Sequence, residues 1–272
     1  MPRFPLVIAA FALGAAPAFA GSPDATGPNA PLIAPGQPDA RTPALVFTLG
    51  LGAGFAPEYF GSDDYRVGPA GSFAFHSLNL GRLSLGDPDP RAERTGFGLR
   101  GSFRYIGERD TSEYSELTGL DDIDAAVELG LGVGYTTRNL DAFVVARRGF
   151  GGHEGVVGEA GFDVIARPSA ALKLTAGPRL FWGNDSYADT YFGVDADEAS
   201  ADLAAFDAQG GLLSAGLEFG ASYRIDDNWG LEGALRWDSF ANDAEDSPIV
   251  RQGSADQWSI SFGVTRVIRI GG

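Results

Sequence analysis

The sequence predicts an all-β fold, a closed antiparallel transmembrane β-barrel of about 10–12 strands with short periplasmic turns and long acidic outer loops. Three observations lead to this prediction. Several long segments alternate apolar and polar residues, and the connections between them are alternately short and long. After the N-terminal segment, the chain has no apolar run of the ~18 residues that a membrane helix needs. A protein of this kind can cross a membrane only with strands.

The clearest alternation runs over residues 213–226, LSAGLEFGASYRID. Leu217 and Phe219 belong to its apolar face, whereas Glu218 belongs to the face with glycine, hydroxyl groups and charges. Successive side chains of a strand point to opposite faces, so we expect one face toward lipid and one toward the interior. A soluble sandwich would instead bury the apolar face against a second sheet. Its strands are typically about five or six residues long, shorter than several segments here.

We expect ten strand segments and no convincing helix, with a bend in one segment at residues 77–79. If both termini are periplasmic the strand count is even, and division of the bent segment would give eleven, or twelve with one further strand. The connections at 137–139, 167–169 and 226–228 are tight, whereas those around 56–66, 108–122, 184–210 and 241–255 are long and acidic. The segments are 44–55, 67–86, 95–107, 123–137, 139–149, 155–167, 170–183, 211–226, 228–240 and 256–270.

The N-terminal region divides into two parts before the barrel. Residues 1–20 have an early Arg3, an apolar run and small residues at Ala18 and Ala20, which is typical of a signal peptide cleaved after Ala20. Residues 21–43 hold six of the sixteen prolines, so we expect a disordered leader. Residues 44–272 form the predicted barrel. The chain is therefore expected in the outer membrane of a Gram-negative cell, in contact with lipid and lipopolysaccharide.

Composition excludes several classes of function. The formal net charge of −16 argues against a nucleic-acid partner, because phosphate binding needs a basic surface. The absence of cysteine excludes disulfides and thiolate chemistry. The acidic loops offer oxygen ligands for Ca²⁺ or Mg²⁺, but no spacing matches the twelve-residue calcium loop. We therefore expect no metal site and no cofactor.

Charged residues of both signs lie on the predicted inward face. We expect them to form a salt network that fills a narrow barrel, because barrels of this size usually hold side chains in the interior. A charge-selective pore is the alternative. The residues are Glu128, Glu159, Asp163, Lys173, Arg179, Glu218, Arg224, Glu232 and Arg236.

Five short motifs in the connections carry a family resemblance. Their order and spacing over roughly residues 44–270 resemble the MipA/OmpV family of outer-membrane proteins. The motif residues that we single out are Glu58, Tyr59, Gly61, Ser62, Asp63, Gly119, Leu120, Asp121, Asp122, Gly151, Gly152, His153, Gly155, Tyr187, Tyr191, Phe192, Gly193, Val194, Ser247 and Pro248.

The resemblance implies a closed barrel and a scaffolding role. For the family's namesake, this role links a lytic transglycosylase to a peptidoglycan synthase, and both enzymes are possible partners here. Other members are described as adhesins or general antigens, so the alternative is a small-solute channel or a surface-exposed binding protein. One departure is that the last strand ends Val267 to Gly272 without the aromatic residue that commonly closes such barrels.

An enzymatic reading rests on His153, one of only two histidines. Asp121, Asp122 and Ser247 could approach it across the loops, as the partners of a hydrolytic histidine do. No local signature supports this arrangement. We expect instead that His153 is a structural residue that holds its loop, that the chain has no catalytic residues, and that the protein is not an enzyme.

Overall fold

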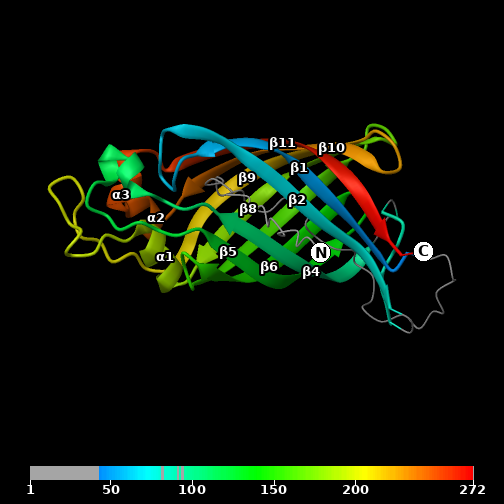
Figure 1. Cartoon of the computed structure of the whole chain (residues 1–272), viewed down its shortest axis with the longest axis horizontal. Coiled ribbons are helices and arrows are strands. Elements are labelled where there is room, and N and C mark those ends of the chain that lie inside the picture. The colour runs from blue at the N-terminus through cyan, green and yellow to red at the C-terminus, as the bar shows by residue number, and fades with distance from the viewer. Residues whose placement is uncertain (1–42, 81–82, 91, 93–94, 272) are drawn as a thin grey trace, which may run out of the picture.

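The computed structural model describes residues 43–80, 83–90, 92 and 95–271, and shows an antiparallel sheet curled around a bore (Figure 1). The predicted signal peptide, and all of the predicted leader except Pro43, lie outside the described residues. The eleven described strands are β1 (Leu45–Pro57), β2 (Tyr65–Leu80), β3 (Leu83–Gly86), β4 (Gly96–Ile106), β5 (Ala126–Thr136), β6 (Leu140–Gly151), β7 (Val156–Ala166), β8 (Leu172–Gly183), β9 (Gly211–Arg224), β10 (Trp229–Phe240) and β11 (Asp256–Ile270).

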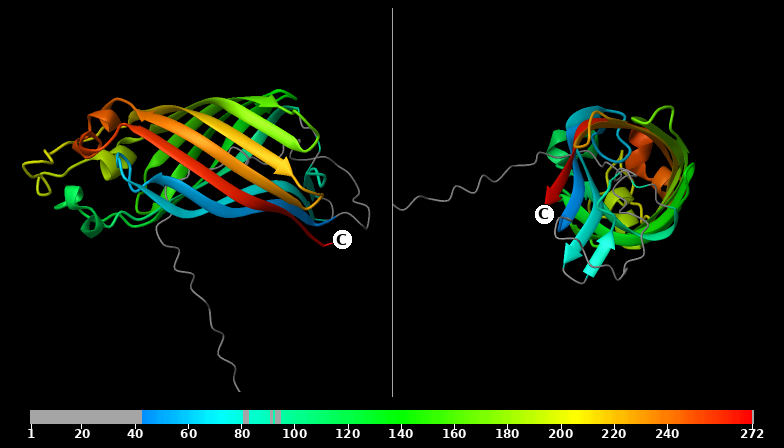
Figure 2. Two further views of the ribbon diagram at one scale, coloured as in Figure 1. Left: turned by 90° about the horizontal axis from the view of Figure 1, so that it is seen from above. Right: turned by 90° about the vertical axis from the view of Figure 1, so that its right-hand side faces the viewer.

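The strand order is β3-β2-β1-β11-β10-β9-β8-β7-β6-β5-β4. β1 pairs with β11, from Leu45 opposite Ile270 to Phe55 opposite Ile260, so the first and last long strands lie side by side. Within the described residues the sheet ends at β3 and β4. The structure therefore shows a curled half-barrel, seen along its length and from one end in Figure 2, and closure stays a prediction.

The strands follow the predicted segments with ends that differ by a few residues, except at 67–86. That segment is a hairpin of two strands, β2 and β3, paired from Ser77 opposite Gly86 to Leu80 opposite Leu83. The predicted bend at residues 77–79 does not divide the segment. It lies beside an irregularity in β2, where the pairing register with β1 shifts between Val46 and Phe47. The eleven described strands lie within the predicted range, but an even count is not seen among them.

The expectation of no helix was wrong. Three short α-helices lie in the described connections: α1 (Asp185–Phe192), α2 (Asp243–Asp246) and α3 (Pro248–Gln252). Two 3-10 helices, η1 (Thr111–Glu113) and η2 (Ser115–Leu117), also lie there. Asn184 caps α1 by accepting from the Tyr187 amide, and Ser247 caps α3 by accepting from the Ile249 amide. None of the described helices is long and apolar enough to cross a membrane.

The outer face of the sheet is apolar and the inner face is polar, as the alternation predicted. Leu217 is 41% exposed and Phe219 is 51% exposed, whereas Glu218 between them is 3% exposed. The same contrast separates Leu131, 71% exposed, from Glu128, which is fully buried. Exposed apolar side chains on strand after strand form a surface far larger than soluble monomers carry, and this is the surface of lipid-facing strands.

The two ends of the sheet differ. The short connections β5–β6, β7–β8 and β9–β10 lie at the end where β1 begins and β11 finishes, and we call this the turn end. The long connections 58–64, 107–125, 184–210 and 241–255 lie at the opposite end, which we call the loop end, and they carry the three α-helices. Figure 2 shows the helices and the C-terminus at opposite ends.

Candidate functional site

Buried ion pairs link neighbouring strands inside the bore, and one of them crosses it. Arg147 of β6 donates to Glu128 of β5 at 2.7 Å and to Glu159 of β7 at 3.0 Å. The other oxygen of Glu159 accepts from Arg236 of β10 at 3.0 Å. Because two strands separate β7 from β10 in the sheet, this last bond spans the interior. The charges are thus compensated in pairs, which buried charges require.

A second group of ion pairs lies nearer the turn end. Arg179 donates to both oxygens of Asp163 at 2.9 Å and to Glu218 at 3.3 Å. Arg100 of β4 is paired with Asp141 of β6. The guanidinium groups of Arg100 and Arg179 lie 4.9 and 5.5 Å from the ring centroid of Phe143. These pairs place further charged side chains inside the bore.

The predicted inward set is largely found there. Glu128, Glu159, Asp163, Arg179, Glu218 and Arg236 are buried, and Glu232 accepts a hydrogen bond from Ser72. Lys173 is only partly buried and Arg224 is exposed, so these two belong to the rim of the turn end. Sequence reasoning missed Arg100, Arg104 and Arg147, which are all buried in the bore.

The long connections pack together into a cap over the loop end. Two clusters of buried apolar residues form the cap, and α1 contributes to the larger one. The larger cluster also includes residues at the loop ends of six strands, so the connections and the strand ends share this core. The larger cluster contains Ile106, Ile123, Ala126, Val157, Phe181, Tyr187, Ala188, Tyr191, Phe192, Ala208, Leu213, Phe240, Ala244 and Val250; the smaller contains Tyr59, Tyr114, Leu117, Leu120, Val194, Leu203 and Ile249.

Many of the motif residues meet in this cap. Tyr187, Tyr191 and Phe192 belong to the larger cluster, and Tyr59, Leu120 and Val194 belong to the smaller one. Ser62, His153 and Ser247 are buried polar members of the same end. Glu58 is partly exposed, and Asp63, Asp121 and Asp122 are exposed. The motifs therefore describe one packed structure rather than five separate loops.

The motif glycines permit the tight path of these connections. Gly61, Gly119 and Gly151 have backbone φ angles of +97°, +103° and +99°, which residues with a side chain rarely adopt. A Cβ on Gly152 would lie 1.8 Å from the carbonyl oxygen of Asp124. Gly193 ends α1, and its amide donates to the Asp189 carbonyl at 2.8 Å.

His153 lies in the connection between β6 and β7 and contacts the cap. The Gly155 amide donates to its Nδ1 at 3.2 Å, and its Nε2 lies 3.5 Å from the Glu128 carboxylate. Its ring packs edge-on against Tyr187 at 5.0 Å and Tyr191 at 5.5 Å. These contacts join the β6–β7 loop to α1 and to the ion-pair network.

The residues of the enzymatic reading have other contacts. Ser247 Oγ donates to the Phe192 carbonyl at 2.7 Å and caps α3. Asp122 accepts two bonds from Thr111, and these bonds hold its pKa below the usual range. Through the described ranges of the chain, no three or more His, Cys, Asp or Glu side chains gather as a metal site.

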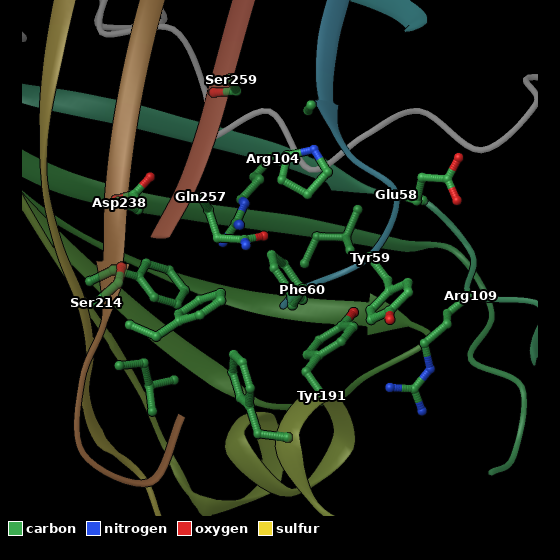
Figure 3. A pocket seen from close by; sticks show the side chains of 18 of the residues that line it. Glu58, Tyr59, Phe60, Arg104, Arg109, Tyr191, Ser214, Asp238, Gln257 and Ser259 are labelled. Carbon is green, nitrogen blue, oxygen red and sulfur yellow. The ribbon is translucent and has the colours of Figure 1, made fainter. Parts of the chain in front are cut away.

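A cavity of about 100 Å³ lies directly beneath the cap (Figure 3). Phe60 stands between Arg104 and Tyr191, with its ring 5.1 Å from that of Tyr191 and 5.6 Å from the Arg104 guanidinium. Beside Phe60, the Tyr59 hydroxyl donates to the Glu116 carboxylate at 3.0 Å. Burial is the main cause that raises the pKa of Tyr59, and the negative charge of Glu116 is the second. We call this cavity the cap pocket.

A larger cavity of about 810 Å³ opens at the turn end. Its lining is polar and carries charges of both signs from the ends of the strands and the short turns. We call it the vestibule. The charged lining residues are Arg100, Arg138, Asp141, Asp163, Arg167, Lys173, Arg224, Asp226, Asp227 and Arg269.

Comparison with known families gives one match that covers most of the barrel. The sequence profile of the family described as "MltA-interacting protein MipA" matches residues 49–268, from β1 to β11. No curated protein matches the chain. The profile and the apolar outer face of the sheet together support placement in an outer membrane.

Several solved structures are similar to this chain at a low level. The NanC porin has a TM-score of 0.37 and 8% identity, with 81% of this chain and 98% of that chain covered. OprG from Pseudomonas aeruginosa has a TM-score of 0.31 and 10% identity, with 84% and 97% covered. The toluene transporter TbuX from Ralstonia pickettii has a TM-score of 0.32 and 8% identity, with 84% and 90% covered. At such TM-scores these likenesses carry no argument about function.

Proposed function

Because the chain belongs to the MltA-interacting protein MipA family, we propose that it is a non-enzymatic outer-membrane barrel that scaffolds peptidoglycan-remodelling enzymes. The partners would be a lytic transglycosylase and a peptidoglycan synthase, held together by one membrane-anchored protein. The family description names an interaction with the enzyme MltA, and this supports the first of the two partners.

The observation that carries this proposal is the filled bore. Ion pairs cross the interior at Glu159 and Arg236, and the cap of connections packs above them. Narrow barrels normally hold side chains inside, whereas open channels are typical of barrels with about 16 strands or more. A filled barrel can anchor and position partners, but it offers solutes no wide path.

The partner surface would lie at the turn end, which we propose faces the periplasm. The short turns alone would give an interface well under the roughly 800 Å² per partner of a standard stable complex. The leader at residues 21–43 would enlarge this interface, because it precedes β1 and β1 begins at the turn end. We expect modest affinity, because a flexible segment loses entropy on binding.

Deletion of residues 21–41, with the signal peptide retained, tests the scaffold. We expect the barrel to assemble, as shown by its heat-dependent migration on a gel, while co-purification of the two cell-wall enzymes falls. A Gly/Ser segment of equal length in place of 21–41 is the matched control for tether length. Unchanged co-purification after the deletion would assign the contact to the turns or deny the scaffold.

A small-solute channel is the second candidate, and the vestibule is the observation that favours it. A further cavity of about 60 Å³ lies inside the bore beside Glu218 and Glu232. Planar-bilayer recording separates the two functions: we expect no steady conductance from the native protein. The double variant Glu159→Ala/Arg236→Ala removes the bond across the interior and is the comparison in which conductance should rise. Steady conductance of the native protein would favour the channel.

We also propose the remaining features of location. Residues 1–20 would be removed after Ala20, so that the mature chain begins at Gly21; N-terminal sequencing of the protein from outer membranes tests this. The exposed acidic loop end would face the cell exterior, beside lipopolysaccharide. Cleavage of loop 184–210 by protease added to intact cells is the expected sign of that orientation.

A further inference from the structure

Buried hydrogen-bond donors without partners gather around the cap pocket. Arg104 is 6% exposed, and among the described residues its Nε and Nη1 have no hydrogen-bond partner. The same holds for the Nε atoms of Arg66 and Arg109 and for the hydroxyl of Tyr191. All four residues line the pocket. Since buried polar groups are normally satisfied, such a concentration points to a ligand with acceptor atoms.

Arg104 faces a carboxylate that it shares with another arginine, whereas Arg66 and Arg109 have only long hydrogen bonds. Arg104 Nη1 lies 3.7 Å from Glu128, a carboxylate that already accepts from Arg147 at 2.7 Å. Arg66 and Arg109 make long hydrogen bonds of 3.4 Å to the Tyr114 hydroxyl and the Asp121 carbonyl. Burial lowers the pKa of Arg109, although a guanidinium still remains charged in proteins.

Arg236 lines the same pocket but is compensated differently. It pairs with Asp238 at 2.5 Å and with Glu159 at 3.0 Å, so it needs no further counter-charge. Glu58 and Glu108, which also line the pocket, are at least partly exposed. Arg66 and Arg109 therefore lack a close negative partner, and Arg104 offers unpartnered donor atoms beside them, although the chain as a whole has a net charge of −16.

The remaining walls are apolar and largely aromatic. They include Phe60, Phe181, Phe192, Leu213 and Phe240. The Arg104 guanidinium lies 4.9 Å from the Phe181 ring centroid, so the charged group sits beside a flat apolar surface. The volume of about 100 Å³ is several times the roughly 10–15 Å³ that one water needs. The pocket thus has room for a small organic molecule.

We propose that the cap pocket binds a small carboxylate with a planar apolar body, of the benzoate class. One carboxylate oxygen would accept from the unpartnered Nε of Arg104, and the Tyr191 hydroxyl and the Nε of Arg109 offer further donors. Burial raises the pKa of Tyr191, so its hydroxyl keeps the proton that it donates. The ring lies among the phenylalanines. This site is separate from the scaffolding surface at the turn end.

The pocket lies beside the two edges of the described sheet. Pro57 and Arg66 come from the β1–β2 side, and Arg104 and Arg109 come from β4 and the residues that follow it. These are the two sides between which no described strand pairing closes the sheet. Arg66 and Arg109 are partly exposed, so a carboxylate meets them before Arg104.

Calorimetric titration of the full-length mature protein in detergent micelles with benzoate tests the site. We expect saturable benzoate binding, and binding of benzamide, which has the same shape without the charge, at least about tenfold weaker. Inorganic phosphate, an anion without an apolar body, should also bind more weakly. No saturable benzoate binding, equal binding of benzamide, or tighter binding of phosphate would each overturn the proposal.

Variants locate the binding. Arg104→Gln and Arg109→Gln should each weaken benzoate binding by about tenfold, because each removes a charged hydrogen-bond donor. Arg251→Gln is the matched control, since Arg251 lies at the same end, is exposed and pairs with Asp246 outside the pocket. If Arg104→Gln does not fold, Arg109→Gln and Arg66→Gln decide. Unchanged benzoate affinity in Arg109→Gln and Arg66→Gln would contradict the site, and so would an equal loss of affinity in Arg251→Gln. These binding results are independent of the co-purification of cell-wall enzymes.

Discussion

The loop end and the turn end of the barrel are built on the same strands, but the loop end is covered by packed connections and the turn end is open. At the loop end, the connections bury two apolar clusters and leave a pocket of about 100 Å³. At the turn end, the connections are short, held by local bonds such as that from the Thr137 amide to the Leu140 carbonyl, and a vestibule of about 810 Å³ remains open.

This difference shows that the connections and the strand ends together decide which end is closed. At the loop end, inner residues of the strands such as Val157, Phe181 and Leu213 are apolar and belong to the larger cluster, whereas the turn end is lined by many charged residues. The long connections add the other apolar residues of the core. Substitutions that disturb the cap or its ion pairs should therefore cost more stability than substitutions in the turns.

The largest effect is expected at Glu128, where the ion-pair network meets the cap. Glu128→Gln removes the charge that compensates Arg104 and Arg147, and breaking a buried pair typically costs about 3–5 kcal/mol. Urea unfolding from lipid vesicles measures the loss. Asp246→Asn is the control, because its exposed pair with Arg251 should be worth only about 0–1 kcal/mol. Equal losses would remove the distinction between the buried and exposed pairs.

The wall between the two ends is tested at Leu217. Leu217→Arg should lower the stability of the folded barrel in a bilayer by roughly 2–4 kcal/mol if the position is near the midplane. Leu217→Val, which keeps an apolar side chain, is the control, and folding yield into vesicles is the measurement. Normal folding of Leu217→Arg together with failure of Glu218→Leu would mean that the assigned inner and outer faces are reversed.

A smaller effect is expected at His153, which joins one connection to the cap. His153→Ala removes the acceptor of the Gly155 amide and should cost about 1–3 kcal/mol. Hydrogen exchange at Gly155 should become faster. Glu154→Ala, an exposed neighbour, is the control. A hydrolytic activity present in the native protein and lost in His153→Ala would instead support the enzymatic reading.

The smallest effect is expected at the turn end, at Asp226. Its carboxylate accepts from the amides of Asn228 and Trp229 at 2.7 and 2.8 Å, and these bonds lower its pKa. A carboxylate with a lowered folded pKa stabilises the fold above its unfolded pKa, near 4, and loses that contribution as pH falls through the folded value. Protection of the Asn228 amide, measured as its exchange rate relative to the intrinsic rate at the same pH, should therefore fall in acid, and in Asp226→Asn this loss of protection should disappear. A pH dependence that survives the substitution would assign it to another group.

Much of the wall could be predicted because strand alternation is local. The alternation along one strand is enough to assign Leu217, Glu218 and Phe219 to opposite faces of the sheet, without any knowledge of the neighbouring strands. The same signal was available for Arg100 and Arg104, which alternate with Leu99 and Phe103, and it would have placed both arginines in the bore. The helix α1 was missed since it is only eight residues long, although Asn184 three residues before Tyr187 is a usable cap signal.

The sequence by itself determined the strand segments, the apolar outer face and most of the charges that point inward, because a period of two residues fixes which side chains share a face. Only the tertiary structure decided how those charges pair and how the connections pack. The bond from Gln257 to the Ser62 carbonyl joins residues 195 positions apart, and that from Arg236 to Glu159 joins residues 77 apart. The cap pocket likewise exists only where β1, β2, β4 and α1 meet, and such meetings depend on the curvature of the whole sheet, which no local pattern contains.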